Sequence, residues 1–173
     1  MPDFSMNRTG AGKQQRLESS EMEYDKAVAE LDRSLVSAVG NKERMKAVVD
    51  ALWTHLSPQG VSWIGFYLPD DTGKELILGP RRDKPACSPI GLHGMCGRAF
   101  LESRPILVED VSTLGENYIA RDPADRSEVV IPVLGADGKP WAVLDLDSHD
   151  VGLFTPADVA GLEQVLASAF PAA

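Results

Sequence analysis

The 173-residue sequence has only two cysteines, few aromatic residues, and no long run of apolar or of basic residues. Two cysteines cannot staple a domain of this size, so an apolar core must stabilise it, and the hydrophobic content of 43% is ordinary for such a core. No apolar stretch approaches the roughly 18 residues that span a bilayer, and the N-terminus lacks the apolar segment of a secretory signal. A cytoplasmic location is therefore the expectation. Because the net charge is −9 and the basic residues are dispersed, we expect binding to neither nucleic acid nor membranes.

Helical and strand patterns follow one another in an order typical of an α+β domain. The polar residues 1–18 lack periodicity and predict a flexible N-terminal tail, followed by a single domain over residues 19–173. Helices are expected at about 19–39, 41–56, 94–103 and 155–170, and strands at 61–68, 75–79, 104–110, 127–134 and 140–148. This order predicts a central antiparallel sheet with helices on one face and ligand-binding loops on the other.

Both cysteines lie in one short segment, CSPIGLHGMC, at residues 87–96. Cys96 lies near a predicted helix start, where backbone N–H groups stabilise a thiolate, and His93 could add to this effect. Cys87 lies earlier in the chain, in a loop between prolines from which it could reach Cys96. The alternative is that one or both are ordinary buried thiols. A zinc site needs four ligands, whereas this segment offers three at irregular spacing, so neither a metal nor another cofactor is predicted.

Acidic and aromatic residues alternate along two of the predicted strands. Asp145 and Asp147 are two residues apart and therefore share one face, where Glu128 of the neighbouring strand could join them. Such a cluster could bind an ammonium group or hold a proton, or it could be a solvated strand end. Trp63 and Tyr67 share a face of the first strand, where they form either a wall for a methyl or thioether group or a core aromatic pair.

Together these segments resemble the stand-alone GAF-domain enzymes called free methionine-(R)-sulfoxide reductases. The resemblance runs from about Tyr24 to the final helix. It is carried, in order, by VSWIGFYL, LILGPRRDKPACSPI, HGMCGRA, VEDV, YIARDPADRSEVVIPV and AVLDLDS with FTPAD. Several such motifs in the same order are more specific than any one of them alone.

The resemblance implies a role for each matching residue. Trp63 and Tyr67 would pack on the methyl sulfoxide end of the substrate, while the sulfoxide and ammonium groups would be bound by Glu128, Asp145 and Asp147. Cys87 and Cys96 match two family cysteines. A third family cysteine, which often attacks the sulfur, is replaced here by Arg121.

The expected activity is reduction of free L-methionine-(R)-sulfoxide, with Cys96 attacking, Cys87 resolving and a thioredoxin-like protein as reductant. Arg121 could favour the thiolate or clamp the ligand's carboxylate, or it could pair with Glu128 or Asp122 and fill the pocket, so activity weaker than that of the family is expected. The alternative is a non-catalytic GAF module that binds a small ligand or senses redox state. A homodimer is expected by resemblance only.

Overall fold

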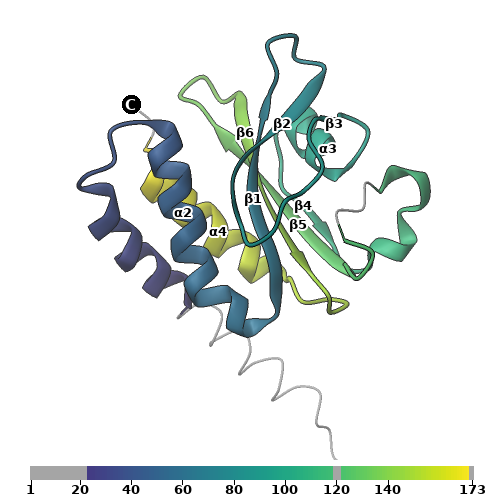
Figure 1. Ribbon diagram of the computed structural model, residues 1–173, viewed down its shortest axis with the longest axis horizontal. Helices are drawn as coiled ribbons and strands as arrows, with labels where there is room; N and C mark the ends of the chain where they lie inside the picture. The colour runs from purple at the N-terminus through teal and green to yellow at the C-terminus, as the bar shows by residue number, and fades with distance from the viewer. Residues whose placement is uncertain (1–22, 119–121, 172–173) are drawn as a thin grey trace, which may run out of the picture.

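A six-stranded antiparallel sheet with the strand order β3-β2-β1-β6-β5-β4 forms the centre of the structure (Figure 1). The structure is a computed structural model, and it describes residues 23–118 and 122–171. Residues 23–35 form the first helical segment. The elements after it are α2 (Asn41–Leu56), η1 (Ser57–Gln59), β1 (Val61–Pro69), β2 (Glu75–Arg82), β3 (Ile90–Gly91), α3 (Met95–Glu102), β4 (Ile106–Val108), η2 (Val111–Thr113), η3 (Gly115–Asn117), β5 (Ser127–Leu134), β6 (Pro140–Ser148) and α4 (Pro156–Ala169).

The larger core lies between one face of the sheet and the helices α2, α4 and 23–35, which Figure 1 shows together on one side. Ile64 and Phe66 of β1 face this core and are fully buried, as are Leu144 and Leu146 of β6. Each such side chain contributes roughly 1.5–3 kcal/mol through the apolar area that it removes from water. This core therefore holds the strands in place, and the opposite face of the sheet is free to carry chemistry.

The opposite face carries α3, the 3-10 turns η2 and η3, and the segment of residues 83–89 that joins β2 to β3, which we call the strap. A second, smaller group of buried residues lies here and includes Trp63, Tyr67 and Cys96. The predicted arrangement, with the main helices on one face of an antiparallel sheet and loops on the other, is confirmed. None of the helices in the described part of the chain combines the length and apolarity that crossing a bilayer requires.

The first helix differs from the prediction at its C-terminal end. It stops at residue 35, and Val39, an apolar residue at the end of the predicted helix, is 95% exposed. The chain turns over residues 36–40, where the N–H of Ala38 donates to the carbonyl of Leu35, so that α2 can run back across the sheet. The predicted tail, residues 1–18, lies outside the described residues.

The last helix begins as its sequence predicts. The backbone N–H of Thr155 donates to Oδ2 of Asp158 at 2.8 Å, the reciprocal half of a capping box, and Pro156 occupies the first helical position. This local signal positions α4 against the sheet without help from distant residues.

Candidate active site

Strand β1 divides its side chains between the two cores. Ile64 and Phe66 point to the helices, whereas Trp63 and Tyr67 point to the opposite face, where they are 3% and 0% exposed. Gly65 lies between the two aromatic residues, and a Cβ atom there would lie 2.2 Å from the Trp63 ring. The glycine is therefore required for the indole to lie flat over the strand. The rings of Trp63 and Tyr67, whose centroids are 6.2 Å apart, form an apolar wall.

The polar ends of both aromatic residues hold the strap. The indole Nε1–H of Trp63 donates to the carbonyl of Lys84 at 2.9 Å, and the hydroxyl of Tyr67 donates to the carbonyl of Cys87 at 2.8 Å. Buried indole and phenol groups usually find such partners. The strap, and with it Cys87, is consequently fixed by the residues that form the aromatic wall.

A second anchor of the strap is an ion pair that the sequence analysis did not predict. Nζ of Lys84 lies 2.5 Å from Oδ2 of Asp122, which follows 38 residues later in the chain. The hydrogen bond from Lys84 lowers the pKa of Asp122, and the same bond raises the pKa of Lys84. Both residues lie in motifs that carry the family resemblance, but their pairing is a tertiary contact that no local pattern reveals.

The three predicted acids lie on the same face of the sheet as the aromatic wall. Asp145 pairs across the sheet with Gly65, and Asp147 pairs with both Trp63 and Glu128. The three carboxyl groups are buried, with Glu128 2% exposed and both aspartates fully covered. The open prediction of a solvated strand end is therefore wrong, because β6 lies in the middle of the sheet between β1 and β5.

Cys96 joins this cluster from α3. It is the second residue of the helix, is 2% exposed, and its Sγ donates to Oδ2 of Asp145 at 3.2 Å. Gly97 allows the preceding turn to cross the helix closely, since a Cβ atom there would lie 2.3 Å from backbone atoms of Leu92. The structure thus brings Cys96 and two strand acids together within one buried site.

The electrostatic environment of Cys96 contains two opposing influences. The N–H groups at the start of α3 favour a thiolate, as the sequence suggests, whereas a charged carboxylate at 3.2 Å disfavours one. In this hydrogen bond the thiol keeps its proton and directs it at Oδ2 of Asp145. Asp145 therefore lies where a carboxylate could accept that proton.

The remaining predicted residues lie apart from this cluster or outside the described chain. Cys87 is exposed, and neither cysteine forms a disulfide. His93 is exposed and its ring lies close to Gly91, so its predicted effect on Cys96 stays a prediction. Arg121 lies outside the described residues.

Two groups of side chains among the described residues have the spacing of metal ligands. The first comprises Cys96, Glu128 and Asp145, whose ligand atoms all lie within 4.8 Å of one another. The second is a surface group of Asp122, Asp125 and His149. In that group the ammonium of Lys84 already provides a cation for Asp122. Neither group includes Cys87 or His93, which the sequence had offered as a partial zinc site.

The sequence pattern of the GAF domain matches residues 42–169. The chain is 37% identical to Protein ZMO0507 of Zymomonas mobilis over 136 residues, which cover 78% of this chain and 81% of that protein. It is 41% identical to the free methionine-R-sulfoxide reductase of Escherichia coli over 110 residues, which cover 62% of this chain and 63% of the reductase, less than two thirds of its length.

A solved structure of free methionine-R-sulfoxide reductase from Neisseria meningitidis, in complex with its substrate, superimposes with a TM-score of 0.78. That comparison has 27% sequence identity and covers 86% of this chain and 87% of the other. Sequence and three-dimensional comparisons thus agree over most of the chain, and this protein belongs to the GAF domain family.

Proposed function

We propose that this protein reduces free L-methionine-(R)-sulfoxide through Cys96 and Cys87. The observation that carries the proposal is the bond from the Cys96 thiol to Asp145, inside a site walled by Trp63 and Tyr67. Similarity to the reductases of Escherichia coli and Neisseria meningitidis supports the choice of substrate. A buried thiol, a proton acceptor and an apolar wall are the groups that sulfoxide reduction needs.

The substrate has four chemically distinct groups, a methyl, a sulfoxide, an ammonium and a carboxylate, and the described residues offer a counterpart for the first three. Its methyl group packs against the Trp63 and Tyr67 rings, as a thioether or methyl group does on an aromatic face. Its ammonium and sulfoxide groups lie against Glu128, Asp145 and Asp147, where protonated carboxyl groups can donate to the sulfoxide oxygen and ionised ones can bind the ammonium. Arg121 is assigned to the substrate's carboxylate in this proposal.

The chemistry proceeds in two steps. The Cys96 sulfur attacks the sulfoxide as Asp145 accepts its proton and the sulfoxide oxygen is protonated, so that methionine leaves and Cys96 becomes a sulfenic acid. The Cys87 thiol then condenses with the sulfenic acid, which forms a disulfide and releases one water molecule. A thioredoxin-like dithiol protein returns both cysteines to thiols and is itself oxidised.

We infer that the strap moves during this cycle, because the exposed Cys87 has to meet the buried Cys96. A disulfide requires their Cα atoms to lie within about 7 Å of each other. The strap is held by single hydrogen bonds from Trp63 and Tyr67 and by the Lys84–Asp122 ion pair. The two hydrogen bonds are individually weak, on the order of 1 kcal/mol each, and the ion pair is partly exposed to solvent, so the strap can rearrange without unfolding the domain.

The experiment is methionine release from L-methionine-(R)-sulfoxide with dithiothreitol, comparing the wild type with Cys96→Ser and Cys87→Ser. The S-epimer of the sulfoxide is the substrate control. We expect multiple turnovers by the wild type, none by Cys96→Ser, and residual turnover by Cys87→Ser because dithiothreitol can reduce the sulfenic acid directly. Equal release by Cys96→Ser and the wild type would exclude Cys96 as the nucleophile.

A non-catalytic GAF module is the second candidate. It is favoured by Arg121, which the family resemblance places at the position of the third family cysteine. Substrate that binds without methionine release would support this candidate, and a large gain of activity in Arg121→Cys would identify residue 121 as the cause. Weakened activity, a cytoplasmic location and a homodimer stay predictions.

A further inference from the structure

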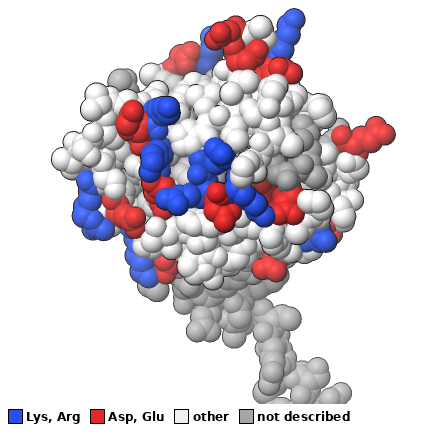
Figure 2. Space-filling model, in the orientation of Figure 1, with Lys and Arg blue, Asp and Glu red and all other residues white. Residues whose placement is uncertain are grey.

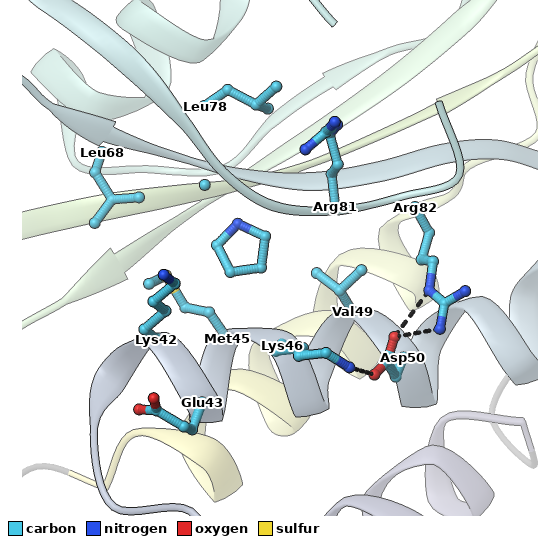
Figure 3. Close-up of a pocket in the computed structure, with 12 residues that line it drawn as sticks. Lys42, Glu43, Met45, Lys46, Val49, Asp50, Leu68, Leu78, Arg81 and Arg82 are labelled. Atoms are coloured by element: carbon cyan, nitrogen blue, oxygen red, sulfur yellow. Dashed lines mark hydrogen bonds and ion pairs between the residues drawn. The ribbon is translucent and has the colours of Figure 1, made fainter. Parts of the chain in front are cut away.

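A groove of about 710 Å³ lies on the helix side of the sheet, away from the candidate active site (Figure 3). It runs between α2 and the last five residues of β2, at the edge of the sheet. Strand β3 pairs with β2 only at residues 75 and 76, so among the described residues no strand lies beside the other end of β2 on its outer side. Its volume falls within the range of small-molecule sites in proteins.

The interior of the groove is apolar. Met45 and Val49 of α2 line one side and Leu68 of β1 lines the floor, with Pro80 contributing from β2. Gly79 keeps the strand side open, because a Cβ atom there would lie 2.8 Å from the side chain of Leu68. The groove therefore offers a continuous apolar surface that an alkyl chain can cover.

A charged cluster with an excess of positive charge closes one end. Asp50 lies between two cations, with its Oδ2 at 2.5 Å from Nζ of Lys46 and its Oδ1 at 2.7 Å from Nη2 of Arg82 (Figure 3). Partial burial of Asp50 opposes ionisation, but hydrogen bonds from Lys46 and Arg82 outweigh it and lower the pKa of this carboxyl group. One carboxylate between two fixed cations leaves one net positive charge at this end.

The rest of the groove's rim also has an excess of positive charge. Lys42 and Glu43 flank the other end, and Arg81 lies above the groove with its side chain directed away from α2 (Figure 3). Even without Arg81, three basic residues line the groove against two acidic ones, in a chain whose net charge is −9. Figure 2 shows lysine and arginine side chains gathered on this face among a few acidic ones.

The length of the groove sets the size of its ligand. Lys42 and Asp50 are eight residues apart on α2, which corresponds to about 12 Å along the helix. We propose that the groove is a second ligand site that binds an amphipathic carboxylate, with an alkyl chain of about ten carbons along Met45, Val49 and Leu68. Its carboxylate lies at the Lys46–Arg82 end. This site is separate from the proposed reduction and does not depend on it.

The test is isothermal titration calorimetry of the full chain with decanoate, at concentrations below the critical micelle concentration of decanoate. Decyltrimethylammonium, which has the same chain and the opposite charge, is the ligand control. We expect decanoate to bind at one site at least tenfold more tightly than the cation. Arg82→Met should weaken the binding of decanoate at least fivefold. Lys139→Met, which removes an exposed positive charge elsewhere, should leave the affinity unchanged.

A groove-filling variant locates the site. Leu68→Trp should abolish decanoate binding, and circular dichroism and thermal unfolding establish that the variant is folded. Equal binding of decanoate and the cation, or no binding of either, would overturn the proposal. Binding that survives Leu68→Trp but is lost in Trp63→Ala would place decanoate at the candidate active site and would equally overturn it.

Discussion

Replacing Gly97 by alanine sets two physical effects against each other. Alanine is favoured over glycine in a helix by roughly 1 kcal/mol, so helix propensity alone predicts stabilisation. However, the new Cβ atom would lie 2.3 Å from the Cα and carbonyl oxygen of Leu92. Ordinary contact begins near 3.4 Å, so the two segments would have to separate by about 1 Å.

The destabilisation by the clash should exceed the gain in helix propensity, because the neighbouring atoms belong to the backbone and cannot rotate away. Overpacking of this kind costs about 1–3 kcal/mol, and a backbone clash belongs at the upper end of that range. After subtraction of the helix propensity, we expect Gly97→Ala to lower the free energy of unfolding by roughly 1–2 kcal/mol. Urea unfolding measures this change, and an unaltered slope would show that the unfolded state is unaffected.

Gly161→Ala in α4 is the matched control. Its Cβ atom would also lie 2.3 Å from a neighbour, but that neighbour is the ring of Tyr24, which is a side chain. Both variants should be destabilised, yet only Gly97→Ala should displace the adjacent Cys96 from Asp145. Reaction of Cys96 with Ellman's reagent, in a Cys87→Ser background, should change in Gly97→Ala alone. A Gly97→Ala protein that is more stable than the wild type would refute the reasoning.

Three further substitutions test individual contacts. The pKa of Asp70 is lowered to about 2, chiefly by the hydroxyl of Thr72. A carboxyl group with a depressed pKa stabilises the fold at pH values above its pKa in the unfolded chain, and this stabilisation is lost as the pH falls through about 2. Asp70→Asn should therefore lower the Tm at pH 7, with the difference vanishing near pH 2 in thermal scans. A difference that persists at pH 2 would show that the ionised carboxylate is not its cause. Lys84→Met should let the pKa of Asp122 rise towards its usual value in an NMR titration, and an unchanged value would contradict the ion pair. Tyr67→Phe should cost about 1 kcal/mol in urea unfolding and speed alkylation of the strap cysteine; unchanged alkylation would show that the hydroxyl does not hold the strap.

The order of the elements and the faces of the strands were determined by local sequence. Alternation along VSWIGFYL separates Ile64 and Phe66 from Trp63 and Tyr67 whatever lies around the strand, because successive side chains point to opposite faces. Capping at Thr155 likewise depends only on residues within one helical turn. The end of the first helix was less predictable, because an apolar residue such as Val39 continues the pattern beyond the point where the chain must turn.

Tertiary structure alone decided how these residues meet. The spacing of Asp145 and Asp147 allowed either a pocket or a solvated edge, and burial followed because the strand order places β6 between β1 and β5. The Lys84–Asp122 pair joins residues 38 positions apart. Local periodicity shows which way a side chain points, but its surroundings depend on strands and loops distant in sequence, whose packing is set by the whole core.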